Sequence, residues 1–174
     1  MAFSDRLKRL DRNIAASDLT VLVWGSGRDS GEAFEKRMKI RQAIEDAFPN
    51  ADVRFSEDQS LKQDLQDHLS LDTRELEDHE QELWHLGACD VCVVLDTSKG
   101  PGEEIAHFTA TPFADRLLIL THKQYQGVRS FPASLRKNQN QIFFSDSEYC
   151  SCGLVQRVLT RLRQVALGKM LGHF

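Results

Sequence analysis

The chain has 174 residues, of which 41% are hydrophobic and 28% charged, with a formal net charge of −4 at pH 7. This acidic balance disfavours nucleic acid as a partner, because nucleic-acid-binding proteins usually carry a basic face. No apolar run approaches the roughly 20 residues that span a bilayer, and the first residues lack the apolar segment of a signal peptide, so we expect a cytoplasmic protein without a membrane partner.

The first third of the chain alternates helices and strands. An amphipathic helix is predicted over residues 3–14, an apolar strand over 20–24, a long helix over 32–48 and a second strand over 52–55. A glycine-rich turn over residues 25–31 separates the first strand from the long helix. We expect the largely apolar face of that helix to comprise Phe34, Met38, Ile40, Arg41, Ile44 and Phe48.

The rest of the chain continues the alternation. Helices are predicted over residues 61–69 and 73–86, then a strand over 91–95, a short helix near Glu104, strands over 117–121 and 141–144, and a helix over 154–171. The acidic residues within 75–82 are typical of a solvated helix face. Residues 123–140 show no periodicity, and loops of that length often act as lids or partner-binding elements.

Five strands alternating with helices predict an α/β fold of the flavodoxin-like type, with a mostly parallel five-stranded sheet and helices on both faces. We see no second-domain boundary and expect residues 1–174 to form one α/β domain. Its N-terminal helix falls within residues 1–17 and its C-terminal helix within residues 151–174.

The four cysteines form two close pairs, Cys89 with Cys92 and Cys150 with Cys152. Two such pairs are compatible with zinc, but Cys92 falls inside the predicted strand over residues 91–95. A zinc knuckle needs an exposed turn between its thiolates. We therefore expect buried reduced thiols and no metal site.

The first candidate binding loop is Gly25-Ser26-Gly27-Arg28, directly after a strand. Its glycines do not have the spacing of a dinucleotide fingerprint or of a phosphate-binding P-loop. The backbone amides can nevertheless face a phosphate or ribose at the start of a helix, and Arg28 can add a charged contact. The alternative is a tight turn with a surface arginine.

The second candidate loop follows the strand over residues 91–95 and contains acids and glycines. Asp96 stands at the carboxyl end of that strand, where open α/β sheets bind ligands. Ser98, Gly100 and Gly102 follow as candidate substrate-binding positions, and Glu103 and Glu104 open the next predicted helix. The alternative for the two glutamates is ordinary helix-start charge that complements the helix dipole.

Together, the segments 88–96 (Ala-Cys-Asp-Val-Cys-Val-Val-Leu-Asp) and 100–106 (Gly-Pro-Gly-Glu-Glu-Ile-Ala) resemble the nucleoside 2-deoxyribosyltransferases. The resemblance covers roughly residues 20–121. It implies that Glu104, ahead of Ile105, is a nucleophile, that Asp96 helps to hold the substrate, and that Trp24 lies near a nucleobase. Ala106 stands where that family usually has glycine. TIR-type NAD hydrolases, whose catalytic glutamate lies in a similar sheet, are the nearest rival family.

These residue types suit cleavage of an N-glycosidic bond, which develops positive charge on the sugar ring. A carboxylate below the anomeric carbon can stabilise that charge or trap the sugar covalently, and a second acid can hold a hydroxyl or protonate the leaving base. Glu104 is the preferred catalytic carboxylate, with Glu103 as the alternative and Asp96 as the second acid.

We therefore expect a hydrolase or transferase acting on a nucleoside, nucleotide or NAD-like small molecule, without a cofactor. Such a domain can act alone, as a homo-oligomer, or as an effector in a nucleotide-depleting antiviral defence complex, as the resemblance implies. Two non-catalytic alternatives share the fold. One is a nucleotide-sensing module, and the other is a protein-interaction scaffold.

Overall fold

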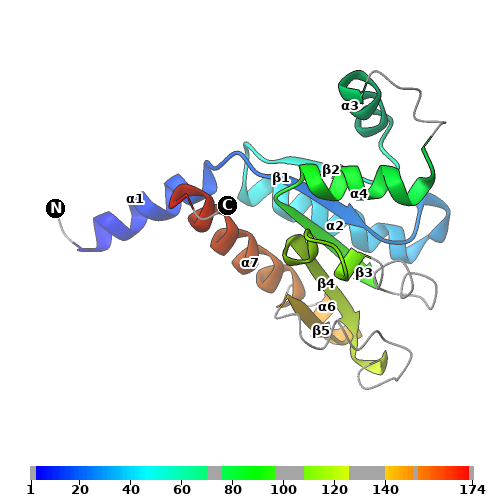
Figure 1. Cartoon of the computed structure of the whole chain (residues 1–174). Coiled ribbons are helices and arrows are strands. Elements are labelled where there is room, and N and C mark those ends of the chain that lie inside the picture. The colour runs from blue at the N-terminus through cyan, green and yellow to red at the C-terminus, as the bar shows by residue number, and fades with distance from the viewer. Residues whose placement is uncertain (1–2, 70–75, 97–107, 126–139, 151–152, 173–174) are drawn as a thin grey trace.

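The computed structural model describes residues 3–69, 76–96, 108–125, 140–150 and 153–172 (Figure 1). Its centre is one sheet of five parallel strands in the order β2-β1-β3-β4-β5. The strands are β1 (Thr20–Trp24), β2 (Asp52–Phe55), β3 (Val91–Asp96), β4 (Leu117–His122) and β5 (Gln141–Phe144). This architecture confirms the predicted α/β flavodoxin-like fold, and all five strands run in the same direction.

The central strands are apolar throughout because both faces of the sheet are covered. In β1, Val21 and Val23 face one hydrophobic cluster, and the alternate residues Leu22 and Trp24 face the other. Side chains of successive strand residues point to opposite faces, so a continuous apolar run is what two covered faces require. Burial of both sets is the main contribution holding the layers together.

Two helices cover one face of the sheet. These are α2 (Glu32–Ala47) and α7 (Gly153–Met170), which bury Ile40, Ile44 and a row of α7 side chains against β1 and β3. The opposite face is covered by α4 (Asp78–Ala88) together with Phe108, while α3 (Gln59–Leu69) lies further from the sheet (Figure 1). Helix α1 (Phe3–Ala15) projects from the body, and the short helix α6 (Asp146–Cys150) precedes α7.

The inward face of α2 differs from the prediction. Met38 is exposed and Arg41 only partly buried, whereas Arg37 is completely buried beside Ile40 and Ile44. Residues 37, 40 and 44 are spaced by three and four positions and therefore share one face of a helix. The expectation failed at Met38 and Arg41 because the helix turns positions 37, 40 and 44 towards the sheet, which leaves position 38 facing solvent and position 41 at the edge of the buried face.

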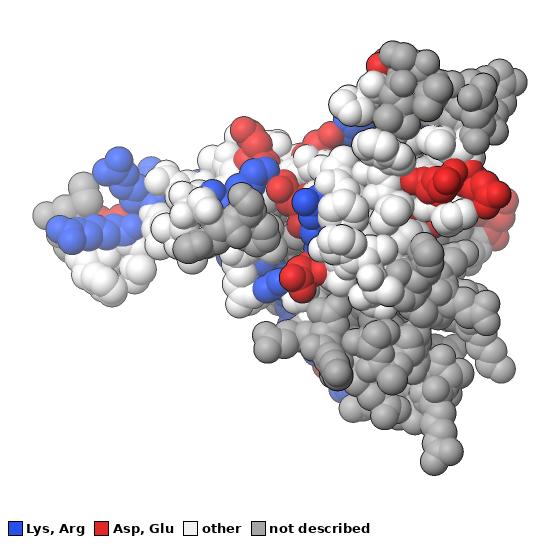
Figure 2. Space-filling view, viewed as in Figure 1, with Lys and Arg blue, Asp and Glu red and all other residues white. Residues whose placement is uncertain are grey.

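Helix α4 begins at Asp78 and not at residue 73, as far as the described residues show. Glu77 is its N-cap, and a reciprocal capping box joins Glu77 to Glu80. This pairing satisfies backbone N–H groups that the first turn leaves unbonded, so the helix begins there. Exposed acids gather over the beginning of α4, as expected of a solvated face (Figure 2).

None of the helices in the described part of the chain combines the length and the apolar character that crossing a bilayer requires.

Candidate site at the carboxyl ends of β1 and β3

The strand order creates a topological switch point between β1 and β3. The chain passes from β1 to β2 on one side and then returns to form β3 on the other side of β1. Trp24 pairs in register with Val94, so the loop after β1 and the loop after β3 leave the same edge of the sheet. Ligands of open α/β sheets bind at such a point. The expectation that these two strands are neighbours is confirmed.

Gly25 brings the two strand ends into direct contact. Its φ is +153°, a value that side-chain-bearing residues rarely adopt, and a Cβ placed there would lie 3.2 Å from the Cβ of Leu95 and 3.1 Å from the Cδ of Arg37. Gly27, in contrast, has open space around the position of a Cβ. Glycine is therefore required at position 25 for close approach, whereas position 27 carries no such steric requirement.

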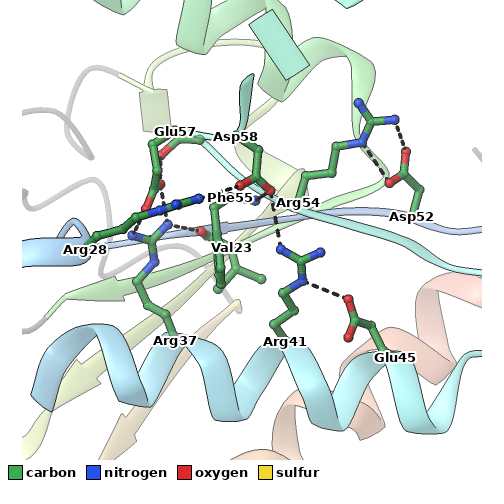
Figure 3. Close-up of polar contacts among 11 residues, drawn as sticks. Val23, Arg28, Arg37, Arg41, Glu45, Asp52, Arg54, Phe55, Glu57 and Asp58 are labelled. Carbon is green, nitrogen blue, oxygen red and sulfur yellow. Dashed lines mark hydrogen bonds and ion pairs between the residues drawn. The ribbon is translucent and has the colours of Figure 1, made fainter. Parts of the chain in front are cut away.

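The buried guanidinium of Arg37 holds the loop that follows β1 (Figure 3). Its Nη2 donates to the carbonyl of Val23 at 2.7 Å, and its Nη1 donates to the carbonyls of Ser26 at 2.8 Å and Gly25 at 3.3 Å. The same two nitrogens form a bidentate pair with the carboxylate of Glu57 at 2.9 and 2.8 Å. Arg37 thus ties the end of β1 to the turn after β2.

The environment of Glu57 keeps its carboxylate ionised. Partial burial alone would raise its pKa, but the hydrogen bonds and positive charge of Arg37, helped by the Ser56 hydroxyl, lower the pKa below its ordinary value. The guanidinium also lies 4.5 Å from the ring centroid of Phe55. A buried cation is tolerated here because a carboxylate, three carbonyls and an aromatic face surround it.

Arg28 lies on the outer side of this cluster, in a short 3-10 turn after Gly27. Its side chain is 65% exposed, and its Nη2 is 3.5 Å from Asp58 Oδ1. Asp58 also forms an ion pair with Arg41 at 3.4 Å and accepts a hydrogen bond from the backbone N–H of Phe55. The Arg28–Asp58 pair is long and exposed, so it restrains the arginine only weakly. This position is compatible with the predicted contact between Arg28 and an anionic group.

Trp24, predicted to lie near a nucleobase, is buried in the core. Only 7% of the residue is exposed, and its ring packs against Phe108 with centroids 5.1 Å apart. Its indole Nε1 is also buried and has no hydrogen-bond partner among the described residues. In this arrangement the indole contributes to packing under the site and offers little surface for stacking on a base.

The acidic half of the predicted site falls mostly outside the described residues. The residues outside the described part are Ser98, Gly100, Gly102, Glu103 and Glu104. The predicted closeness of Glu104 to the first glycine loop therefore also lies outside the described residues. Asp96 is placed by its backbone, as the last residue of β3 in register with Thr121, but its side chain is not described.

A cavity among the described residues lies away from this edge. It has a volume of about 730 Å³ and lies between the sheet face at Thr20 and Leu22 and the helices α3 and α4, against Leu65 and Leu83. His85 also borders it, and burial lowers the pKa of that imidazole. Of the residues predicted to bind substrate, those that the structure describes (Trp24, Gly25, Ser26, Gly27 and Arg28) do not line this cavity.

The described residues offer no cluster of three or more His, Cys, Asp or Glu side chains that could hold a metal ion. Cys89 and Cys92 are buried, as expected, and burial raises the pKa of the Cys89 thiol to about 12. Thiols in that state are poor ligands and poor nucleophiles. The side chains of Cys150 and Cys152 fall outside the described residues.

Comparison of the sequence with models of known protein families and with curated proteins finds no match.

Sequence reasoning missed the two residues that organise the described part of the site, Arg37 and Glu57. Arg37 shares the helical spacing of Ile40 and Ile44, and Glu57 follows the end of β2 just as the first loop follows β1. A basic residue on an otherwise apolar helix face, with an acid beyond a neighbouring strand, was the available signal. Such a signal becomes specific only when β1 and β2 are known to be adjacent, because Glu57 then lies beside the end of β1.

Proposed function

We propose that this chain binds a nucleoside, nucleotide or NAD-like molecule at the carboxyl ends of β1 and β3 and cleaves or transfers its N-glycosidic bond. The observation that carries the proposal is the contact between Gly25 and Leu95. It sets the first glycine loop directly against the strand that leads to Asp96, Glu103 and Glu104. This arrangement supports the proposal that a ligand bound to that loop meets acids of the second loop, since ligands of open α/β sheets bind where such loops converge.

The contacts of Arg37 support a binding role for the first loop. The carbonyls of Gly25 and Ser26 point inward to the guanidinium. In a planar trans peptide the following N–H points the opposite way, so the amide of Gly27 is directed away from Arg37. An outward-facing amide beside the exposed Arg28 suits a phosphate or a ribose hydroxyl.

The chemistry needs only carboxylates and water or an acceptor base. As the bond between C1′ and the base nitrogen breaks, its electron pair leaves with the base. The base of a nucleoside or nucleotide takes up a proton from an acid or from water, whereas the electron pair alone neutralises the pyridinium of an NAD-like substrate. A carboxylate, Glu104 in the preferred assignment, stabilises the positive C1′ or bonds to it. Attack by water then releases the free sugar, and attack by a second base completes a transfer. Asp96 holds a sugar hydroxyl in this scheme.

The test is a mass-spectrometric screen for free base after incubation with nucleosides, deoxynucleotides and NAD. Glu104→Gln should reduce base release by at least about a hundred-fold, because a neutral amide does not stabilise the developing cation. Glu35→Gln, an exposed acid in the first turn of α2, is the matched control and should retain activity.

Three results would change the assignment. Activity lost in Glu103→Gln and kept in Glu104→Gln would transfer the catalytic role to Glu103. Release of base that survives both substitutions would refute a carboxylate mechanism at this loop, and tight binding without any release would instead identify a nucleotide sensor.

A further inference from the structure

The projecting helix α1 carries an apolar stripe that the described part of the chain leaves largely uncovered. Phe3 is 77% exposed, Leu7 51% and Leu10 39%, whereas Ile14, the next residue of the stripe, is buried in the core beside α7. The stripe is therefore covered where α1 meets the body and open where the helix projects (Figure 1). Exposed large apolar side chains in a row are uncommon on a monomer surface and mark interaction sites.

A second group of exposed apolar side chains lies at the end of α7. Helix α1 packs on α7, and Met170 and Leu171 at the end of α7 are exposed. Five of the seven large apolar side chains exposed in the described part of the chain belong to α1 and to this end of α7, which separates the patch from scattered surface residues. We call the set Phe3, Leu7, Leu10, Met170 and Leu171 the α1 patch.

The spacing of the stripe is that of a coiled-coil seam. Phe3, Leu7, Leu10 and Ile14 are separated by four, three and four residues, the alternation of d and a positions in a heptad repeat. With Leu7 at a, Arg6 occupies a g position and Asp11 the following e position. In a parallel pair of helices a g residue faces the next e residue of the partner, so Arg6 of one copy meets Asp11 of the other.

This charge complementarity indicates which partner binds the α1 patch. We propose that the α1 patch is the interface for a second copy of this chain, formed by parallel pairing of α1 with the α1 of the partner. Two-fold symmetry then repeats the Arg6–Asp11 pair on both sides of the seam. An antiparallel pair would set e against e and g against g, which brings no opposite charges together in this helix.

The same features disfavour a membrane surface as the occupant. An interfacial membrane helix presents a wide apolar face, whereas a seam restricted to a and d positions is narrow. Lys and Arg cover much of the projecting end of α1 (Figure 2), but the acidic Asp11 lies at the edge of the seam, where a lipid surface would meet it. Asp11 also lies 3.7 Å from Arg163 Nε, and both side chains stay largely exposed, so this pair leaves the edge accessible.

The short length of the seam predicts a weak dimer. The exposed seam spans little more than two helical turns, and short helix pairs are marginal by themselves. Association is therefore expected to depend on concentration, with a dimer at high concentration that dissociates on dilution. The residues of the candidate site do not belong to the α1 patch, so dimer formation and the proposed activity are tested independently.

The test is sedimentation velocity of the chain over a range of concentrations. The expected result is a reversible change between the mass of one 19.8 kDa chain and that of two. Leu7→Lys should weaken association by at least about ten-fold, because it sets a charge in the centre of the seam. Arg9→Glu, a c position outside the seam, is the control with little expected effect. Far-ultraviolet circular dichroism checks that each variant is folded.

Charge reversal tests the orientation. Arg6→Glu alone and Asp11→Lys alone should each weaken the dimer, because each places like charges opposite one another. The double variant should recover association, since the reversed charges again attract. A monomer at every concentration, a dimer insensitive to Leu7→Lys, or double-variant association no better than in the single variants would overturn the proposal. So would a monomer that co-sediments with phosphatidylcholine–phosphatidylglycerol vesicles.

Discussion

Replacement of Arg37 by methionine removes the buried charge that joins the ends of β1 and β2. Methionine keeps an unbranched apolar stem of similar length against Phe55, so the change mainly deletes the guanidinium. Five hydrogen bonds are lost, three to carbonyls and two to Glu57. We expect the variant to fold but with clearly lower stability.

The magnitude follows from what remains unpaired. Breaking a buried ion pair by removing one partner typically costs about 3–5 kcal/mol. The side chain of Glu57 is 30% exposed, so water can solvate part of its carboxylate, and we expect a loss of about 3 kcal/mol, the lower end of this range. For a chain of this size each kcal/mol changes the melting temperature by about 2–4 °C, which corresponds to a decrease of about 6–12 °C.

Urea denaturation followed by circular dichroism measures this loss, with Arg41→Met as the matched control. Arg41 lies one turn further along α2 and is partly exposed, with ion pairs to Glu45 and Asp58. Its substitution should cost no more than about 1 kcal/mol. Similar losses for the two variants, or a loss below about 1 kcal/mol for Arg37→Met, would refute the view that the buried guanidinium stabilises this edge of the sheet.

Three further predictions concern Gly25, the Glu57 carboxylate and the two buried cysteines. Gly25→Ala should lower the free energy of unfolding in urea by about 1–3 kcal/mol, because the new Cβ meets the neighbouring strand and the residue keeps a φ of +153°. Gly27→Ala should be nearly neutral. Equal effects of the two substitutions would contradict the steric argument. The pKa of Glu57 is lower in the folded chain than its ordinary 4.5, so its contribution to stability is present above that value and is lost as the pH falls through the folded pKa. The urea midpoint of the wild type should therefore decrease more than that of Glu57→Gln between about pH 6 and about pH 3, and parallel curves would argue against the ion pair. Cys89 and Cys92 should not react with a thiol reagent until the chain is unfolded, and elemental analysis should find no stoichiometric zinc. One zinc per chain, or rapid labelling of both thiols, would contradict their burial as free thiols.

The secondary structure was largely predictable because it depends on local patterns. The apolar runs at residues 20–24, 91–95 and 117–121 are strands of the observed sheet, and alternation with helices was sufficient to predict a parallel flavodoxin-like arrangement. The neighbouring positions of β1 and β3 followed from the same topology and placed Gly25 and Asp96 at one edge. Helix boundaries were less accurate where a cap decides them, as at Glu77.

The positions of individual side chains were decided only by the tertiary structure. No local pattern shows that Arg37 is buried, because its burial depends on Glu57, twenty residues away, and on carbonyls of another element. Trp24 lies in the core because Phe108 packs on it, and the stripe on α1 is open because this helix projects from the body beyond its contact with α7. The helical and strand periodicities are properties of consecutive residues. Burial of a charge and exposure of an apolar face depend on which distant segments pack there, and this is settled only when the chain folds.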